Sequence, residues 1–175
     1  GFPARIDTRD AWTRRWRSKR ASAVRDAVRS CRVRPDGRQH DPSLDAGGHD
    51  IVVWDERADA VRALERDGAS PARSLDDLAT RLASPRAIWM MVPAGDATEN
   101  TVTALAERLD RGDTIIDGGN THFKDDIRRV RELTPKGLQC VGVGTSGGIW
   151  GAERGYCLMV GGTPDSFLHL IPLFR

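Results

Sequence analysis

Two glycine-rich turns, each directly after a short apolar run of strand character, constrain this chain most. The runs are Thr114–Ile116 and Leu138–Val143, and they lead into Asp117-Gly118-Gly119-Asn120 and Gly144-Thr145-Ser146-Gly147-Gly148. In an open parallel sheet, ligands bind outside the carboxyl ends of the strands, where such turns lie. Glycine lets backbone N–H groups approach an anionic ligand, and the Asn and Ser side chains add hydrogen bonds. Either turn alone would be an ordinary strand-to-helix connection, but the pair favours a binding site.

Two further segments fit the same sheet. Ile51–Trp54 is a β-branched run between polar residues, and Arg86–Val92 is almost free of polar side chains. Continuous apolar character is typical of a strand buried on both faces of a parallel sheet. Glu56–Asp67 and Asp96–Leu109 carry apolar residues at helical spacing. The alternation predicts an α/β fold, a Rossmann-like parallel sheet with helices on both faces.

The segment resembles the nucleotide-binding domain of decarboxylating 6-phosphogluconate dehydrogenase, in the bacterial form usually associated with NAD. The matching stretches are Ala87–Gly95, Ile116–Asn120 with the following Lys124–Arg129, and Gly144–Gly162. The resemblance covers about His49 to Arg175 and does not extend to residues 1–48. It implies two domains of the chain, a leader over 1–48 and an NAD(P)-binding domain over 49–175.

The resemblance implies an oxidoreductase that moves a hydride from the C3 hydroxyl carbon of 6-phosphogluconate to a nicotinamide, after which CO₂ leaves and ribulose 5-phosphate remains. In the family, a Lys base and a Glu acid lie in the helical segment after this domain, and no position here matches them. We therefore expect no catalytic residue in this chain and no turnover by it alone. Cofactor binding is expected to be weak at best, because the first strand and the glycine loop that seat the pyrophosphate at a helix terminus are missing. We also expect the family's all-helical C-terminal domain, which forms its homodimer, to be absent.

Asp55 follows the strand Ile51–Trp54. A dinucleotide-binding domain places there the carboxylate that accepts a hydrogen bond from the adenosine ribose 2′-OH. Such a carboxylate repels a 2′-phosphate, so NAD is favoured over NADP, although Arg57 would soften the repulsion. The alternative is that Asp55 only caps the helix over Glu56–Asp67, which is compatible with either cofactor.

The remaining expected site residues follow the other strands. Small and rigid residues at Val92, Pro93, Ala94 and Gly95 would let the ribose or nicotinamide lie against the backbone, and in the resembled family this turn contacts the cofactor. The resemblance further implies that Asn120 bridges cofactor and substrate. It also implies that a hydroxyl and two N–H groups hold the carboxylate and hydroxyls of the sugar acid, those of Ser146, Gly147 and Gly148. No metal site is expected.

Lys124-Asp125-Asp126 and Arg128-Arg129 form a charge run on the helix after Asn120. Such a run is usually a solvated face, so we expect no catalytic role for it. His122 and His169 are expected to be structural, because a lone histidine is more often so than a base.

Residues 1–48 differ from the rest of the chain. They hold 12 Lys and Arg against 6 Asp and Glu, whereas the whole chain has a net charge of only +2. They show no apolar periodicity, and the strand and Gly-x-Gly-x-x-Gly turn that open a Rossmann domain are missing. We expect a basic leader without ordered structure and a first βα unit that is missing or degraded.

The genetic code offers an explanation for the leader. With suitable codons, Arg38–Gly48 read one base forward encodes an amphipathic helix of the type expected before His49. Extending the shift through Cys31–Gly37 gives the missing Gly-x-Gly-x-x-Gly. We hypothesise that the residues before His49 are translated out of frame.

Two other functions remain open at this point. A related β-hydroxyacid dehydrogenase, such as the 3-hydroxyisobutyrate type, shares Ser146-Gly147-Gly148 and Met159–Gly162, whereas Asp117–Asn120 and Gly151–Tyr156 favour the sugar-phosphate enzyme. A non-catalytic protein could instead bind nucleic acid through the basic arm, which an out-of-frame leader makes unlikely. Salt-dependent DNA retention that disappears on deleting residues 1–48 would favour that function.

Composition places the protein in the cytoplasm. No apolar run reaches the roughly 18 residues of a membrane span, so no membrane partner is expected. Cys31, Cys140 and Cys157 have no metal or redox spacing and are expected to be buried thiols of a cytosolic protein.

The frame hypothesis predicts a specific result from the coding DNA between Cys31 and His49. We expect a one-base deletion in a G/C run just before His49, with a glycine-loop strand restored in the shifted frame. Codons incompatible with the shifted reading would refute the hypothesis and make the basic leader a genuine part of the protein.

Overall fold

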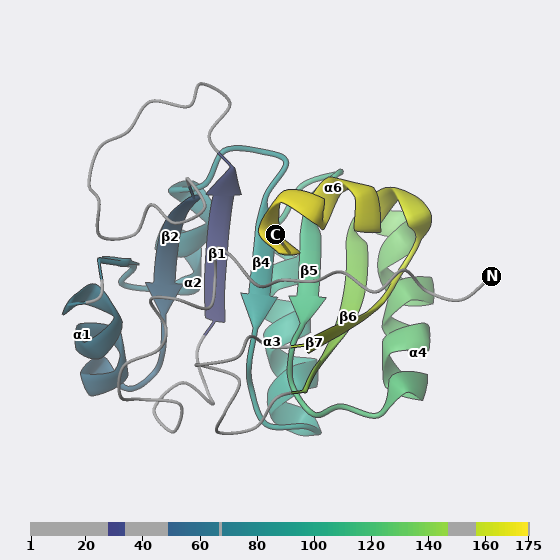
Figure 1. The fold of residues 1–175 in the computed structure, drawn as a ribbon, viewed down its shortest axis with the longest axis horizontal. Coiled ribbons are helices and arrows are strands. Elements are labelled where there is room, and N and C mark those ends of the chain that lie inside the picture. The colour runs from purple at the N-terminus through teal and green to yellow at the C-terminus, as the bar shows by residue number, and fades with distance from the viewer. Residues whose placement is uncertain (1–27, 34–48, 67, 147–156, 175) are drawn as a thin grey trace.

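The computed structural model describes residues 28–33, 49–66, 68–146 and 157–174. Within these ranges the strands form one sheet of seven, in the order β3-β2-β1-β4-β5-β6-β7 (Figure 1). The strands are β1 Val28–Val33, β2 His49–Trp54, β3 Ser70–Pro71, β4 Ala87–Met90, β5 Thr114–Asp117, β6 Gln139–Ser146 and β7 Cys157–Gly161.

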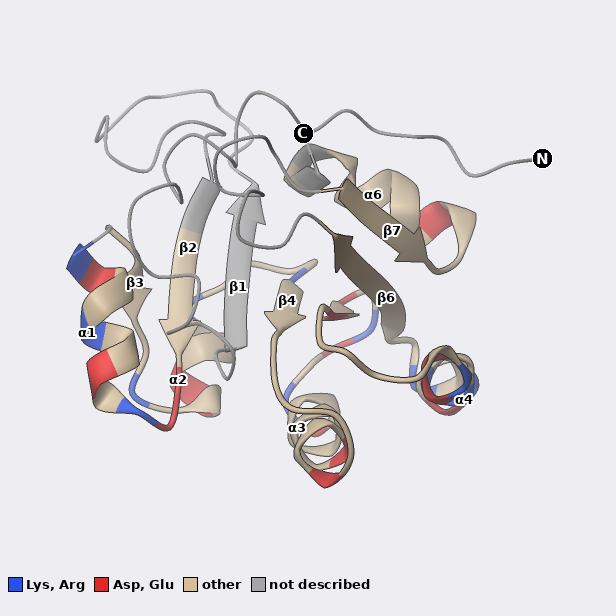
Figure 2. Cartoon of the chain, turned by 60° about the horizontal axis from the view of Figure 1, so that its bottom comes forward, with Lys and Arg blue, Asp and Glu red and all other residues tan. Residues whose placement is uncertain are grey.

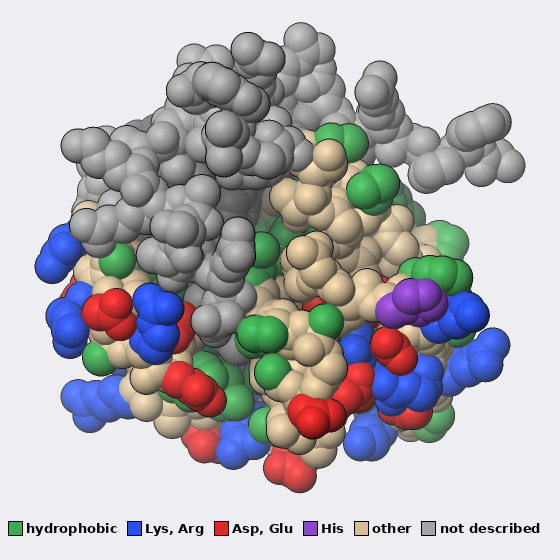
Figure 3. Space-filling model, turned by 90° about the horizontal axis from the view of Figure 1, so that it is seen from below, with side chains coloured by type: hydrophobic (Ala, Val, Ile, Leu, Met, Phe, Trp, Pro, Cys, Tyr) green, Lys and Arg blue, Asp and Glu red, His purple; other side chains and the backbone are tan. Residues whose placement is uncertain are grey.

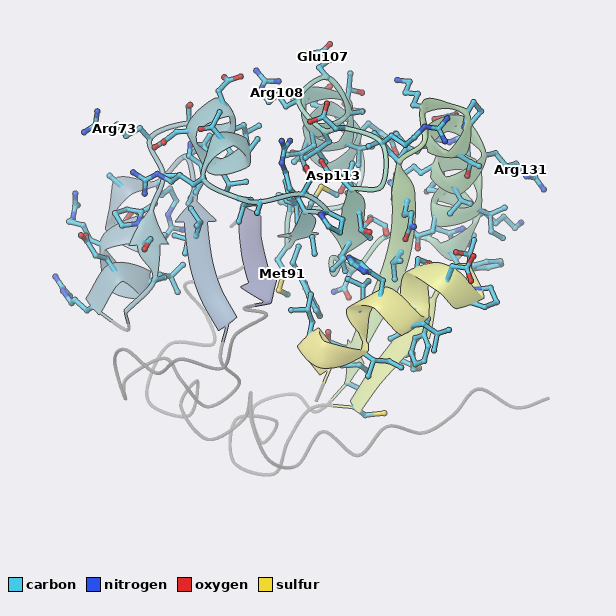
Figure 4. The ribbon with its side chains drawn as sticks, turned by 90° about the horizontal axis from the view of Figure 1, so that it is seen from above. Arg73, Met91, Glu107, Arg108, Asp113 and Arg131 are labelled. Carbon is cyan, nitrogen blue, oxygen red and sulfur yellow. The ribbon has the colours of Figure 1, made fainter. Side chains whose placement is uncertain are left out.

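Helices cover both faces of this sheet, as predicted. One face carries α2, α3 and α4, and the other carries α1 and α6, so that the yellow α6 lies across the sheet from α3 in Figure 4. The helices are α1 Ala58–Arg66, α2 Leu75–Thr80, α3 Asp96–Ala106, α4 Phe123–Leu133 with the 3₁₀ turn η1 Thr134–Lys136, and α6 Pro164–Phe174.

Alternating side chains of the interior strands supply the two cores. In β4, Ile88 and Met90 enter the core under α2 and α3, whereas Ala87 and Trp89 lie on the α6 side. In β5, Ile115 and Ile116 divide in the same way and are both completely buried. A strand with apolar residues at every position is stable only where both faces are covered, which is the expected doubly wound α/β fold.

The sheet is mixed rather than wholly parallel, which corrects the prediction. β4, β5 and β6 run parallel to one another, as do β2 and β3. β7 is antiparallel to β6, and β1 is antiparallel to both of its neighbours, β2 and β4. Because β1 is reversed relative to both, β2 and β4 point the same way, and their carboxyl ends meet at one edge.

The leader that we expected to lack structure therefore contributes one strand, β1. It occupies the place between β2 and β4 where the missing first strand was expected, but in the opposite direction, with Val28 opposite Trp54 and Met90. The physical reason is hydrogen bonding, because interior strands facing an empty slot would leave backbone N–H and C=O groups unpaired. An antiparallel strand satisfies those groups as well as a parallel one.

The strand β6 is longer than predicted. It continues through Gly144, Thr145 and Ser146, which we expected to form a turn. Its first half pairs with β5, from Gln139 to Gly142, and its second half pairs only with β7. β7 provides the backbone partners that turn residues would have lacked, and this tertiary pairing extends the strand past the glycine.

Asp113 joins the amino ends of β4 and β5. Its carboxylate is completely buried and accepts hydrogen bonds from the backbone N–H groups of Arg86 at 2.6 Å and Asp110 at 2.9 Å. The Arg86 guanidinium lies 3.4 Å from the same carboxylate. In Figure 4, which looks onto this edge, Asp113 lies among the strand ends while Glu107 points outward. The carboxylate thus fixes the spacing of two central strands.

The structure describes the burial of two of the three cysteines, and one of these two departs from expectation, while the side chain of Cys31 lies outside what it describes. Cys140 is buried, and its burial raises the thiol pKa to about 12, but Cys157 in β7 is exposed. The prediction of buried thiols is therefore wrong for Cys157, because β7 lies at the edge of the sheet. In the described part of the chain, no helix has the length and apolar character needed to cross a membrane.

Asp113→Ala should destabilise the protein by about 3 kcal/mol, because two backbone donors and a guanidinium lose a buried acceptor. Asp110→Ala is the matched control, since its 73% exposed carboxylate also pairs with Arg86, and it should cost less than about 1 kcal/mol. Urea unfolding of both variants measures the difference. Equal losses would show that Asp113 does not lock the strand ends.

Candidate functional site

The expected site residues of the described chain lie at one edge of the sheet. Asp55 follows β2, Val92–Gly95 follows β4, Gly118–Asn120 follows β5, and Ser146 ends β6. These strands point the same way, so their carboxyl ends share the lower edge in Figure 1. Figure 2 brings this edge forward. Gly147 and Gly148 lie outside the described residues, so their expected role stays a prediction.

The turns after β4 and β5 are in direct contact. A Cβ added at Gly119 would lie 2.8 Å from the carbonyl oxygen of Val92, and one added at Gly118 would overlap the indole of Trp89. The Gly118 N–H also donates to the carbonyl of Met90 at 2.9 Å. Gly119 therefore allows the close approach of the two turns, and Gly118 allows the approach of its turn to the Trp89 indole, which a residue with a side chain would prevent.

The turn after β4 is fixed to the start of α3. Val92 is buried, whereas Pro93, Ala94 and Gly95 are exposed. The completely buried hydroxyl of Thr98 donates to the carbonyl of Pro93 at 2.8 Å. Gly95 has a φ of 97°, which favours glycine, and it forms the N-cap of α3. The Thr98 hydrogen bond and the Gly95 cap thus fix the conformation of the exposed turn Pro93–Gly95.

Asp117 organises the turn after β5. One carboxylate oxygen accepts from the Gly119 N–H at 2.9 Å, and the other accepts from the Thr121 hydroxyl at 2.8 Å. The carboxylate is completely buried, while Asn120 is exposed. Asp117 thus turns inward to hold the loop, while the side chain of Asn120 remains exposed.

Arg129 corrects the prediction that the charge run on α4 is a solvated face. It is only 1% exposed, and its guanidinium contacts Asp117 at 2.8 Å, Asp126 at 2.9 Å and Glu99 at 2.7 Å. Helical spacing would have identified it, because Arg129 and the buried Leu133 are four residues apart on one face. Figure 3 looks onto this edge and shows side chains of both signs meeting between α3 and α4.

This cluster shifts the pKa values of its members. Burial raises the pKa of Asp126, and the nearby charge of Asp117 adds to the rise. Burial also acts to raise the pKa of Glu99, but hydrogen bonds from Arg128 and Arg129 outweigh it and lower that pKa. Burial acts to lower the pKa of Arg129, and the surrounding carboxylates reverse the shift and raise it. The guanidinium therefore stays charged.

Asp55 directly follows β2, and its exposed fraction is only 7%. Its carboxylate accepts from the Arg57 N–H at 2.8 Å, which is the local bond expected of a residue that begins the turn into α1. The Arg57 guanidinium lies 3.4 Å from Asp59. The capping role and the ribose role of Asp55 are both compatible with this geometry, since a carboxylate has several acceptor positions.

Besides the Asp55 carboxylate, the expected site residues described at this edge offer backbone groups, the Asn120 amide and the Ser146 hydroxyl. Ser146 is exposed at the end of β6, and His122 uses its ring nitrogen to accept from the Lys124 N–H at 3.3 Å, as a helix cap. No group of three metal-ligating side chains occurs among the residues described. Such an edge is suited to binding and orienting a polar ligand.

Comparison with known proteins identifies a family. The sequence model of the NAD binding domain of 6-phosphogluconate dehydrogenase matches residues 38–175. The match begins earlier than His49, where the resemblance was expected to begin. The NAD(+)-dependent, decarboxylating 6-phosphogluconate dehydrogenase of Haloferax volcanii is 46% identical over 134 residues, which are 77% of this chain and 44% of that protein. The chain spans less than half the length of the curated relatives it matches.

Solved structures share the fold. The 6-phosphogluconate dehydrogenase of Plasmodium falciparum, described with NADP+ and with its substrate, has a TM-score of 0.63 at 22% identity, over 70% of this chain and 28% of that one. The 3-hydroxyisobutyrate dehydrogenase of Mycobacterium tuberculosis has a TM-score of 0.61 at 20% identity, over 69% and 40%. At these identities the likeness concerns the fold alone, so the choice of family depends on the sequence match.

Gly118→Ala should destabilise the protein by about 1–3 kcal/mol, because the new methyl group overlaps the Trp89 indole. Gly161→Ala is the control, since its added Cβ has only the Gly142 carbonyl within 4 Å, at 3.9 Å, and it should be close to neutral. Thermal unfolding compares the two. A neutral Gly118→Ala would contradict the close contact between the turn after β5 and the Trp89 indole of β4.

Proposed function

Because this chain belongs to the family of the NAD binding domain of 6-phosphogluconate dehydrogenase, we propose that it is the cofactor-binding part of an enzyme of that activity. The reaction would be the oxidative decarboxylation of 6-phosphogluconate to ribulose 5-phosphate. The observation that carries the proposal is the family match over residues 38–175. The fold supports it, since the ends of the strands that carry the expected site residues share one edge of the sheet. The substrate is accordingly a sugar-phosphate acid.

The nicotinamide cofactor would supply the hydride acceptor, and this chain's residues would supply its seat. The exposed backbone of Pro93, Ala94 and Gly95, with the adjoining Val92, would lie against the ribose or nicotinamide. Asn120 would reach both cofactor and substrate from the neighbouring turn, because Gly119 and Val92 are in contact. Ser146, followed by Gly147 and Gly148, would hold the carboxylate and hydroxyls of the sugar acid.

We assign no proton-transferring residue to this chain. The groups proposed to face the nicotinamide and the sugar acid are backbone amides, the Asn120 amide and the Ser146 hydroxyl, which orient reactants and do not exchange protons readily near neutral pH. The charged cluster of Arg129 lies beneath the turns and is occupied by its own ion pairs. The contribution of the chain to catalysis is therefore the fixed placement of cofactor and substrate.

We further propose that NAD is preferred over NADP. The buried Asp55 carboxylate lies at the end of β2, where it would accept from the ribose 2′-OH and repel a 2′-phosphate. Arg57, which would have softened that repulsion, has its guanidinium near Asp59 instead. That pair reduces the positive charge available to a phosphate.

Titration with NADH and NADPH tests both proposals. We expect weak binding, with NADH bound at least about tenfold more tightly, a difference of about 1.4 kcal/mol. Asp55→Ala should bring the two affinities closer together, because the repulsion of the 2′-phosphate is removed. Glu65→Gln is the control, since it removes an exposed carboxylate of α1 and leaves the Arg57–Asp59 pair in place, and it should keep the preference for NADH. Equal affinities in the unmodified chain would overturn the NAD preference, and no binding of either would overturn the cofactor role.

A further inference from the structure

The guanidinium of Arg129 connects elements that are distant in the sequence. Among the residues that the structure describes, it is the largest completely buried side chain, and all three of its side-chain nitrogens donate. Nη1 bonds Asp117 in β5 and Asp126 in its own helix, while Nε and Nη2 bond Glu99 in α3 at 3.1 and 2.7 Å. The residue thus joins α4 to β5 and to the first turns of α3.

Two of these contacts, those with Asp117 and Glu99, lead to turns of the proposed site. Asp117 holds the Gly119 N–H, and so fixes the turn that carries Asn120. Glu99 lies in the first turn of α3, where its own N–H donates to the carbonyl of Gly95. The guanidinium is therefore connected to the turn after β5 through Asp117 and to the turn after β4 through Glu99.

Stability alone is a weak reason for this arrangement. A buried ion pair loses much of its Coulomb attraction to desolvation, so apolar residues of similar volume are often as stable. The planar fork of arginine, however, fixes the direction of each carboxylate that it contacts. That property matters where two turns must be held at a set separation.

We propose that Arg129 is a positioning residue, which holds the turns after β4 and β5 at a fixed separation and keeps them ordered, so that they fit one ligand. This inference rests on the proposed function for the identity of the ligand. The inference goes beyond the proposed function, because it assigns a role to a buried residue that touches neither cofactor nor substrate.

Amide hydrogen exchange tests the positioning directly, without a ligand. In Arg129→Met, exchange at Gly119 should rise at least about tenfold, because Asp117 loses its fixed direction. Exchange at Gly112, whose N–H donates to the Gly137 carbonyl at the opposite edge, should rise less. Arg128→Met is the matched control, since Arg128 also bonds Glu99 at 2.7 Å but is 43% exposed. It should leave Gly119 unchanged.

The outcomes separate positioning from general stabilisation. Parallel rises at Gly119 and Gly112, or no rise at Gly119, would overturn the proposal. If Arg129→Met does not fold, Arg129→Lys replaces it, because lysine keeps the charge but not the planar fork. A selective but smaller rise at Gly119 is then expected, and its absence would equally overturn the proposal.

Cofactor affinity gives the second readout. NADH affinity should fall by about tenfold or more in Arg129→Met, recover in part in Arg129→Lys and stay unchanged in Arg128→Met. Unchanged affinity in Arg129→Met would overturn the ligand part of the inference. If the unmodified chain binds no NADH, the proposed function fails on its own, and the exchange measurements still decide whether Arg129 orders the turns.

Discussion

The fold depends on satisfying the backbone hydrogen bonds of β2 and β4, the two interior strands on either side of the expected first strand. Their apolar side chains are covered on both faces, so the polar groups of their backbones can find partners only within the sheet. β1 provides them, with six residue pairs to β2 and four to β4. Without that strand the sheet would divide into two parts, and the strand ends that form the site would not share an edge.

The strand β5 is held by a buried carboxylate at each end. Asp113, just before it, accepts two backbone N–H bonds at the amino edge, and Asp117, its last residue, accepts one more at the carboxyl edge. Each is also paired with an arginine, Arg86 and Arg129 respectively. The two pairs have different consequences, since the first fixes strands to each other and the second fixes a turn that faces a ligand.

The sequence allowed the prediction of elements whose signal is local. The β-branched run of β2 and the apolar run of β4 depend on neighbours in the chain, and both strands are confirmed. The extension of β6 and the direction of β1 depend on partners far away in the sequence, and no local pattern contains them. Arg129 falls between these cases, because its helical face was visible but the carboxylate that it meets was not.

The reversal of β1 has a consequence for any phosphate-binding loop that would follow this strand. A six-residue strand spans roughly 20 Å, so Val33, the last residue of β1, lies about that far from the edge that holds Asn120 and Asp55. Val28, its first residue, lies at that edge instead. The backbone hydrogen bonds of the sheet tolerate this change of polarity, because a strand in either direction satisfies them. A phosphate-binding loop, which must follow its strand to reach the ligand, has no such tolerance.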